Sequence, residues 1–433
     1  MSVAVVGAGV TGLTIARRLS DAGQDVCVFD GGNAGGLASG FEFPGVHGTY
    51  LERFYHHIFR TDKHVIDLIR EHGLESDLLW RHSRPGLYAG GRIWPLESPL
   101  DLLRCRPVGG LLDRLKMGWN LRTFQKTPDW RPFDSITCEE FFRRHGNLRG
   151  YQGLWEPLLK AKFGDAYANT PAAFLWGRIY PRSRSREGGK ECLGYLRGGF
   201  QRLMVAVVEK LEKSGVEFRL GTKVERIDRT GRGDFALSAG GKTGSYDRLV
   251  WTGHPGDLTR LLFPEDGELK RRASQIQYIG ACCLVLLLDK PLGTYYWINN
   301  LDPAITFGGV IEHTNLVDPR DYGGRHIAYV INYLASDHPQ LALDADEVFR
   351  LHLPSLRKLY PSFDESTVRD KLLFKSTRAS PLYDRAFLLR MPPFTGWSKG
   401  IGLLGMPQVY PMDRNMNHCV EVALQADLNQ LLS

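Results

Sequence analysis

The sequence lacks the cysteine and histidine spacings that mark disulfide-rich and metal-binding proteins. Its seven cysteines are an odd number, are scattered over 433 residues and include no CxxC pair, so a disulfide framework is not expected. Cys27, Cys282 and Cys283 stand in apolar, strand-like runs, where reduced thiols pack into a core. No HxH or HExxH spacing occurs, and we therefore expect no metal ion.

The sequence also lacks a long hydrophobic run and a strong excess of one charge. The longest apolar stretch, residues 279–288, is roughly half as long as a bilayer-spanning helix requires, and no basic segment precedes the apolar amino terminus. The net charge of +7 is mild for this length and hints at anionic ligands. Because lysines do not cluster, no nucleic-acid partner is expected. We expect a cytoplasmic protein with no transmembrane segment and a small-molecule substrate; its oligomeric state is left open.

The sequence does contain a glycine-rich loop between a predicted strand and a predicted helix. Residues 3–6 form a short apolar run, and Gly7, Gly9 and Gly12 follow it with the spacing GxGxxG. In a Rossmann unit the first glycine permits a tight turn, the second lets the backbone approach a pyrophosphate, and the third lets the helix pack on the strand. Helical periodicity follows over residues 11–22. The pattern therefore predicts dinucleotide binding.

An acidic residue follows the second predicted strand at the expected place. Asp30 ends the apolar run 26–29 and stands eighteen residues beyond the last glycine of the loop. A carboxylate there accepts hydrogen bonds from ribose hydroxyls and repels a 2′-phosphate. Gly35, Gly36 and Leu37 come a few residues later, and a second glycine pair at that place suggests backbone close to a flavin dinucleotide. We expect FAD rather than NAD as the cofactor.

The α/β pattern stops and later resumes, which predicts a discontinuous domain. Helix-like segments replace it after residue 60, and residues 400–432 give a strand, a loop and a final helix. Strands of the returning parallel α/β domain are expected at 216–220, 223–228, 235–239 and 249–251. We predict an α/β fold in which a Rossmann-type FAD-binding domain is joined to a mixed α+β substrate domain. The predicted FAD-binding domain comprises residues 1–60, 190–255 and 385–433, and the substrate or cap domain comprises residues 61–189 and 256–384.

Over essentially its whole length the chain resembles the superfamily of flavin-containing amine oxidases, protoporphyrinogen oxidases and phytoene desaturases. The resemblance rests on the motifs above, the glycine pair 198–199, the strand at Val224, residues 247–250 and the terminal helix. It implies that the backbone of Val224 holds the adenine edge. It also implies that Asn415 and Met416 begin a helix whose N–H groups stabilise negative charge on the pyrimidine ring of the reduced flavin.

Two positions depart from the pattern of that superfamily. Gly405 is followed by Met406, whereas these families usually have an aspartate that contacts the ribityl-phosphate region of the cofactor. Leu37 replaces the arginine frequently found just after the second glycine pair. Gly405 and Leu37 nevertheless remain candidate cofactor-binding residues.

A second set of motifs is similar to those of UDP-galactopyranose mutases. Residues 57–61 resemble the segment that places a histidine near the flavin, and residues 154–164 followed by 178–182 resemble the stretch that carries mobile-loop arginines. Tyr410 and residues 415–417 resemble the mutase tyrosine and its Asp-Met-Asp, with asparagine in place of both aspartates. The resemblance makes His57 and Tyr410 catalytic candidates.

Four arginines lie within nine residues, at positions 178, 182, 184 and 186. Guanidinium groups bind a diphosphate bidentately, so Arg178 and Arg182 are candidate substrate-binding residues for a diphosphate-bearing molecule. The alternative is a solvated basic loop. The two interpretations differ in which groups lie next to the arginines in the folded chain.

The β-rich stretch after residue 274 supplies three further candidates. Tyr296 and His313 are candidate substrate-binding residues on a sheet expected to face the substrate. Because neighbouring side chains alternate across a strand, at most one of Glu312 and His313 faces a pocket, and wall packing or a salt bridge is an equal alternative. Arg378 lies just ahead of the returning FAD segment and is a catalytic candidate for that reason.

The preferred interpretation is an FAD-dependent oxidoreductase that transfers a hydride from a C–N or C–C bond of a small molecule to the flavin. The cofactor carries the chemistry in such an enzyme, which explains why no nucleophile or metal motif is present. The alternative is a flavin-dependent, non-redox mutase that acts on a nucleotide sugar. A flavin-binding protein without turnover is the third interpretation.

Overall fold

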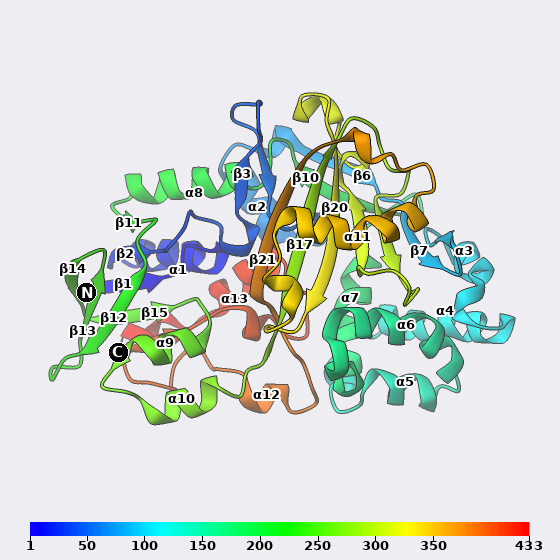
Figure 1. Ribbon diagram of the computed structural model, residues 1–433. Coiled ribbons are helices and arrows are strands. Elements are labelled where there is room, and N and C mark those ends of the chain that lie inside the picture. The colour runs from blue at the N-terminus through cyan, green and yellow to red at the C-terminus, as the bar shows by residue number, and fades with distance from the viewer. Residues whose placement is uncertain (433) are drawn as a thin grey trace.

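The computed structural model describes residues 1–432 and is organised around a five-stranded parallel sheet (Figure 1). The order of its strands is β11-β2-β1-β15-β22, and every neighbouring pair is parallel. The strands are β1 (Ser2–Val6), β2 (Asp25–Phe29), β11 (Glu217–Arg219), β15 (Arg248–Trp251) and β22 (Ile401–Leu403). Three distant parts of the chain therefore pair in one sheet. The boundaries of the two predicted domains stay a prediction.

Helices cover the parallel sheet because its strands are apolar on both faces. Residues 3–6 of β1 are all buried, as expected for a strand inside a parallel sheet. Helix α1 (Val10–Asp21) packs on β1 and β2, with α8 (Gln201–Lys213) and α13 (Met416–Gln425) beside it. Helix α2 (Lys63–Glu71) contacts α13 in turn, and the short α14 (Leu428–Leu432) ends the described chain.

Two strands expected in the parallel sheet belong to a separate antiparallel one. The order of this sheet is β14-β13-β12-β16, and β12, β13 and β14 are joined as an antiparallel meander. Its strands are β12 (Val224–Arg229), β13 (Phe235–Ala239), β14 (Lys242–Tyr246) and β16 (Leu262–Phe263). The expectation of parallel pairing for 223–228 and 235–239 was wrong because loops this short join only antiparallel strands. Gly240 and Gly241, both at positive φ, form the tight turn between β13 and β14.

A seven-stranded sheet forms the centre of the rest of the molecule. Its order is β21-β17-β20-β19-β18-β7-β8. The strands are β7 (Pro85–Ala89), β8 (Arg92–Pro95), β17 (Tyr278–Leu288), β18 (Trp297–Asn300), β19 (Gly309–Glu312), β20 (His326–Leu334) and β21 (Val368–Pro381). Every residue of β17 is buried, because α11 (Ala345–Leu359) covers β17 and β21.

The remaining strands and helices connect and flank these sheets. A small sheet contains β5 (Ile58–Phe59), β6 (Leu78–His82), β9 (Arg186–Glu187) and β10 (Lys190–Leu196), and β3 (Gly40–Glu42) pairs with β4 (Tyr50–Glu52). A helical subassembly lies at the right of Figure 1 and contains α3 (Pro99–Arg104), α4 (Leu111–Lys126), α5 (Cys138–Arg144), α6 (Leu148–Phe163) and α7 (Ala172–Arg182). The short helices are α9 (Pro255–Leu261), α10 (Gly267–Ala273) and α12 (Phe387–Arg390).

Candidate functional site

The glycine-rich loop adopts a turn that only glycine permits. Gly7 has φ of 112°, in a region that residues with side chains rarely occupy, and its N–H donates to the carbonyl of Phe29 at 2.7 Å. A Cβ on Gly12 would lie 1.8 Å from the carbonyl oxygen of Gly7. Gly9 is the N-cap of α1 and no side chain caps the helix. The first turn of α1 therefore presents uncapped backbone N–H groups, which suit a pyrophosphate.

Asp30 lies at the carboxyl end of β2, beside the glycine-rich loop. Its carboxylate accepts the N–H of Ala8 and the N–H of Gly32, each at 2.8 Å. The carbonyl of Asp30 accepts the N–H of Thr222 at 2.9 Å, so the segment that leads into Val224 runs alongside the end of β2. The structure thus brings the two residues predicted for the adenosine half of the cofactor to the same edge of the sheet.

The second glycine pair contacts the first loop directly. Gly35 donates its N–H to the carbonyl of Ala8 at 2.8 Å and forms a β-bridge with Gly9. A Cβ on Gly36 would lie 3.2 Å from the Cα of Gly9, which is closer than most side chains tolerate. Leu37 follows in the 3-10 turn that Gly36 begins. These contacts fit the prediction that Gly35, Gly36 and Leu37 form part of the cofactor cradle.

The terminal helix α13 lies beside α1 and points in the same direction (Figure 1). Arg18, in the last turn of α1, donates two hydrogen bonds of 2.7 Å to the carbonyls of Ala423 and Ala426 at the carboxyl end of α13. The amino ends of both helices therefore face the same side. Asn415 caps α13 by accepting the N–H of His418 at 2.9 Å. Two positive helix ends directed at one region suit an extended anionic cofactor.

Gly405 lies where the parallel sheet meets the glycine-rich loop. A Cβ at this position would be 3.3 Å from the carbonyl of Thr252, and the hydroxyl of Thr252 donates to the carbonyls of Val6 and Gly7. The N–H of Gly405 donates to the side chain of Gln408 at 2.9 Å. The position predicted from the family pattern is thus beside the cradle, although Met406 supplies no carboxylate.

Arg178 is paired with a carboxylate that sequence analysis did not single out. Its guanidinium lies 2.8 Å from Asp413, and the ammonium of Lys162 lies 3.6 Å from the same carboxylate. Burial raises the pKa of Asp413, but the charges of Arg178, Lys162 and Arg414 outweigh burial and hold that pKa well below its usual range. Burial and the charge of Arg178 lower the pKa of Lys162. Asp413 is therefore ionised and neutralises Arg178.

Arg182 is also paired with a carboxylate. Its guanidinium lies 3.0 Å from Glu191, which accepts a 2.6 Å hydrogen bond from the hydroxyl of Ser83. Burial raises the pKa of Glu191, but the charge of Arg182 and the bond from Ser83 leave it lowered. Arg182 also lies over the ring of Phe59. Arg184 and Arg186 are exposed and bond mainly to backbone carbonyls, including Tyr180 and Gly189; for these two the solvated-loop interpretation fits.

His57 and Tyr296, predicted independently, are in contact. The hydroxyl of Tyr296 and Nδ1 of His57 are 3.2 Å apart, and the His57 ring also packs edge-on against Phe59 and Trp297. Burial and the nearby charge of Arg182 lower the pKa of His57 to about 3. His57 is therefore neutral and held in place by aromatic side chains.

The neighbouring histidine is fixed in one tautomer. Nδ1 of His56 lies within hydrogen-bond distance of the carbonyl of Phe54, and a carbonyl only accepts, so Nδ1 carries the proton. Burial lowers the pKa of His56 to about 4. The imidazole is neutral, which leaves Nε2 unprotonated and able to accept a proton.

Two tyrosines complete this group of residues. The hydroxyls of Tyr55 and Tyr333 are 3.0 Å apart, and Arg414 donates to the hydroxyl of Tyr333 at 3.3 Å. Burial raises the pKa of Tyr55 well above its ordinary value. We call Tyr55, His56, His57, Tyr296, Tyr333, Asp413 and Arg414, with Arg178 and Arg182, the central cluster.

Side chains of the central cluster are enclosed by protein and yet keep accessible surface. Asp413 retains 38 % of its side-chain surface and Arg182 retains 40 %, although burial is the largest influence on the pKa of both. Side chains that are surrounded by protein and still have accessible surface line an internal space. The backbone N–H of Arg53 donates to the carbonyl of Ser39, just after the second glycine pair. The Nε of Arg53 is buried without a hydrogen-bond partner among residues 1–432. The cradle, the two helix ends and this unpaired cation fit FAD.

Three predicted site residues lie outside the central cluster. Arg378 pairs with Asp257 of α9 at 2.6 Å. The hydroxyl of Tyr410 donates to Asp134, and its ring packs on Tyr383. His313 is 2 % exposed and its Nε2 lies 2.9 Å from the hydroxyl of Tyr322, so the wall-packing interpretation fits it.

Sequence reasoning did not assign Lys162, Asp413 and Arg414 to the site. Lys162 offered a signal, because a lysine on the apolar side of a helical stretch either extends to solvent or meets a buried charge. Asp413 and Arg414 directly precede the predicted terminal helix, so their proximity to the flavin end was available from the chain order. Their pairing with residues on α6 and α7 was not.

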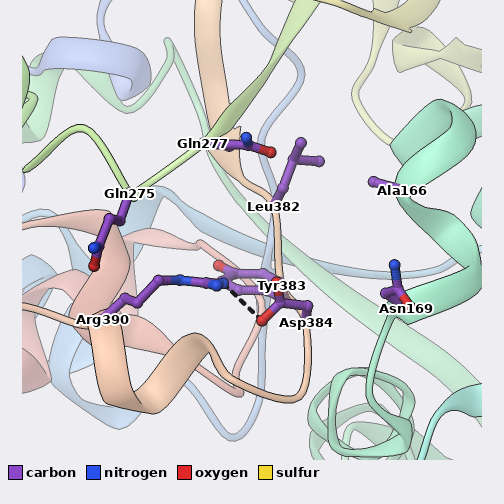
Figure 2. Close-up of a pocket in the computed structure, with 8 residues that line it drawn as sticks. All are labelled: Ala166, Asn169, Gln275, Gln277, Leu382, Tyr383, Asp384 and Arg390. Atoms are coloured by element: carbon purple, nitrogen blue, oxygen red, sulfur yellow. Dashed lines mark hydrogen bonds and ion pairs between the residues drawn. The ribbon is translucent and has the colours of Figure 1, made fainter.

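A cavity of about 170 Å³ lies beside the central cluster (Figure 2). Its lining is largely polar and comes from the 3-10 segment η5 (Gly164–Asn169), the segment before β17, the residues just after β21, and α12: Ala166, Asn169, Gln275, Gln277, Leu382, Tyr383, Asp384 and Arg390. The charges of Asp413, Arg414 and Arg178 act on Tyr383, which places this tyrosine between the cavity and the cluster. The ion pair of Arg390 with Asp384, at 2.6 Å, crosses the lower part of the view.

Comparison with known families gives one match to a large part of the chain. The model of the flavin-containing amine oxidoreductases matches residues 10–379, which agrees with the resemblance stated from the motifs and with FAD as the cofactor. Among residues 1–432 no helix is both long enough and apolar enough to cross a membrane, and the same residues contain no group of three side chains suited to hold a metal ion.

Curated relatives align with part of the chain. A probable zeta-carotene desaturase of Synechococcus elongatus is 27 % identical over 187 residues, which are 37 % of this chain and 38 % of the relative. The zeta-carotene desaturase of a Synechocystis species is 26 % identical over 254 residues, 52 % of this chain and 50 % of the relative. The chain thus spans about a third to a half of the length of the curated relatives it matches.

Solved structures align with nearly all of the chain and show its fold. A putative protoporphyrinogen oxidase from an Exiguobacterium species superposes with a TM-score of 0.77 at 16 % identity, covering 100 % of this chain and 99 % of that one. A reduced UDP-galactopyranose mutase gives 0.75 at 16 % identity, covering 99 % and 97 %. A putrescine oxidase variant gives 0.72 at 14 % identity, covering 100 % and 98 %. The predicted fold class is confirmed.

Proposed function

The chain belongs to the family of flavin-containing amine oxidoreductases, and on that premise we propose that it is an FAD-dependent enzyme that oxidises a C–C or C–N bond of an organic substrate without phosphate groups by passing a hydride to the flavin. The observation that carries the proposal is the charge balance of the central cluster. Arg178 is neutralised by Asp413 and Arg182 by Glu191, so neither arginine is free to hold a diphosphate. Because both arginines of α7 are paired and aromatic side chains surround them, the site suits a substrate without phosphate.

Such an oxidation removes a hydride and a proton from the substrate. FAD, when bound, accepts the hydride. The proton needs an acceptor within the enclosed site, and we assign this role to His56, because the bond from Nδ1 to the carbonyl of Phe54 leaves Nε2 unprotonated. His57, held by Tyr296 and Trp297, orients the substrate. For a C–C bond the second hydrogen leaves the neighbouring carbon as the proton; for a C–N bond it leaves the amine nitrogen.

The first substrates to test are long polyenes. The curated relatives that align with the chain are zeta-carotene desaturases, and their name suggests oxidation of a C–C bond. Trp297 packs on Tyr55 at 4.8 Å between ring centroids, and Phe59 and Tyr296 flank His57. Aromatic walls of this kind favour an extended apolar molecule. Amines are the second group to test, since the putrescine oxidase variant shares the fold.

One observation supports a nucleotide-sugar mutase as a second candidate. Arg414 and Arg53 each have an Nε that is buried without a hydrogen-bond partner among residues 1–432, and no carboxylate of those residues lies within 4 Å of either guanidinium. These two cations suit an anionic group in the site. The group is the cofactor under the oxidoreductase proposal and a sugar diphosphate under the mutase proposal.

The test is a comparison of flavin bleaching with nucleotide binding. Under anaerobic conditions a polyene or an amine should bleach the flavin absorbance, and UDP should fail to bind in either redox state of the flavin. His56→Ala should slow bleaching. The conservative control Tyr180→Phe, on the solvated side of α7, should bleach as fast as the unaltered protein. Absence of bleaching by every polyene and amine, together with UDP binding that Arg178→Ala and Arg182→Ala each weaken by about 1.5–3 kcal/mol, would replace the oxidoreductase proposal by the mutase.

A further inference from the structure

Helix α4 (Leu111–Lys126) has apolar residues on two opposite sides. Met117 and Phe124 are fully buried on the side that faces α6 and α7. Four large apolar side chains are exposed on the other side, by 50 to 72 %: Leu111, Leu112, Leu115 and Trp119. At 3.6 residues per turn these four positions fall within roughly 100° of the helix circumference. They form one stripe rather than scattered exposed residues.

Basic residues are interleaved with this apolar stripe. Arg122 and Lys126 lie on the same side of α4 and are exposed, whereas the exposed Lys116 lies at the edge of the stripe and its ammonium donates to the carbonyl of Gly146 at 2.8 Å. None of them, nor Arg104 and Arg106 just before the helix, lies within 4 Å of a carboxylate in the part of the chain that the structure describes. The carboxylates of Asp113 in α4 and Asp101 in α3 are engaged in capping boxes, where they accept the N–H groups of the N-cap residues Gly110 and Ser98. The stripe therefore carries unpaired positive charge.

We propose that this outer side of α4, extended by the half-exposed Leu100 of α3, docks on the surface of a bilayer that contains anionic lipids. Leucines and a tryptophan interleaved with unpaired lysines and arginines are the pattern of a helix that lies flat in the lipid interface. Tryptophan favours the level of the headgroups, and the cations attract the anionic headgroups. The helix lies on the membrane and does not span it.

Charge decides against a second copy of the chain as the occupant. In a two-fold dimer the same patch meets itself, so Arg122 and Lys126 would face the same cations of the other copy. The stripe contains no carboxylate that would compensate them. An anionic lipid surface satisfies both the apolar side chains and the charges.

The position of α4 in the fold agrees with this orientation. Figure 1 shows α4 at the rim of the helical subassembly, far from the N-terminus. Its buried side packs on α7, the helix that carries Arg178 and Arg182. Docking would therefore place the central cluster one helix layer from the bilayer. The inference rests on the α4 surface alone and holds whichever substrate the enzyme uses.

The test is co-flotation of the flavin-loaded full chain with vesicles. The protein should float with vesicles of equimolar phosphatidylcholine and phosphatidylglycerol, and should stay behind with vesicles of phosphatidylcholine alone. Added salt should weaken the binding. Leu112→Ser combined with Leu115→Ser should weaken it at least about tenfold, and Arg122→Gln and Lys126→Gln should weaken it about fivefold each. The control Leu389→Ser, at a 90 % exposed leucine of α12, should bind as the unaltered chain does.

Trp119→Phe is a conservative variant that can be tested even if one of the serine variants loses its flavin. Brominated lipids should quench part of the tryptophan fluorescence of the unaltered chain, and Trp119→Phe should remove that part. The inference is overturned if the unaltered chain ignores the mixed vesicles, or if binding and quenching are the same in the α4 variants. It is also overturned if sedimentation shows a dimer that Trp119→Phe dissociates, because a second copy is then the occupant.

Discussion

Asp413 and Glu52 are both carboxyl groups inside the protein, and their surroundings move their pKa values in opposite directions. Asp413 faces two arginines and a lysine and is held ionised. Glu52 is completely buried and accepts hydrogen bonds of 2.7 Å from the hydroxyl of Tyr195 and the N–H of Phe200, with no cation near it. Burial therefore raises the pKa of Glu52 to about 7. Neighbouring charge, rather than depth, decides which carboxyl is ionised.

The raised pKa of Glu52 predicts a loss of stability as the pH rises from 4.5 to about 7. In that window the folded chain keeps a proton that the unfolded chain releases, so stability is full below the window and falls through it, by up to about 1.4 kcal/mol per pH unit. Above the window the effect is constant. Glu52→Gln should flatten the slope of the unfolding free energy, measured by urea titration. Glu209→Gln, the same change on the exposed side of α8, should leave the slope as it is, and equal slopes in all three proteins would contradict the prediction.

Asp30 is predicted to retain the cofactor by two routes. Its carboxylate holds the N–H groups of Ala8 and Gly32, and it is the proposed acceptor of the ribose hydroxyls. Asp30→Ala should lower the affinity for FAD at least about tenfold, the worth of one charge-assisted hydrogen bond, as measured by the flavin absorbance of the purified protein. Asp25→Ala, at the exposed start of the same strand, is the control. Undiminished flavin in Asp30→Ala would remove Asp30 from the site.

Among whole elements, α1 and α13 are the pair on which the cofactor site depends. They lie parallel because Arg18 of α1 caps the carboxyl end of α13 through the carbonyls of Ala423 and Ala426. A cation at a helix carboxyl end is also favoured by the helix dipole. This contact fixes the direction of the amino end of α13, which the sequence could only assign to the flavin by resemblance.

Arg18→Ala is predicted to destabilise the protein by about 1.5–3 kcal/mol, since two charge-assisted hydrogen bonds to backbone carbonyls are lost. It should also speed release of the flavin, because the carboxyl end of α13 is no longer held against α1 and the direction of the helix is less firmly fixed. Unfolding in urea and the flavin dissociation rate measure the two effects. Arg17→Ala is the matched control, since Arg17 makes only partly exposed ion pairs with Asp21 and Glu71, worth up to about 1 kcal/mol. A smaller effect at Arg18 than at Arg17 would contradict the assignment.

For the molecule as a whole, the parallel sheet gathers strands that are separated by up to four hundred residues of chain. β22 joins β15, which joins β1, so residues 401–403 complete a sheet that begins at residue 2. A discontinuous FAD-binding domain, as predicted from the sequence, would need such pairing, and the domain stays a prediction. Its boundaries need a measurement of their own.

Hydrogen exchange with and without FAD provides that measurement. FAD should slow exchange together in residues 2–29, 217–219, 248–251 and 401–425, because one ligand stabilises one cooperative unit. Residues 345–359, on α11 in the predicted cap, serve as the internal control and should change little. Protection confined to the first sixty residues would refute the discontinuous domain.

The sequence alone determined the features that depend on spacing along the chain. Gly7 and Gly12 predict their turn because Gly7 has a positive φ and a side chain on Gly12 would collide with the carbonyl of Gly7. The position of Asp30 could be predicted because it directly follows β2, a strand of five residues. The wrong expectation about strands 223–228 and 235–239 was also a local matter, since the short connection between them, residues 230–234, already indicated an antiparallel hairpin.

The tertiary structure alone decided the charge state of the site. Arg178 meets Asp413 across 235 residues of chain, and Tyr296 meets His57 across 239. Whether an arginine is free for a diphosphate or neutralised by a carboxylate depends on these distant partners, and no spacing within residues 178–186 reveals them. The motifs therefore predict the place of the cofactor, because local backbone geometry forms the loop, whereas a prediction of the substrate requires the long-range pairing of buried charges.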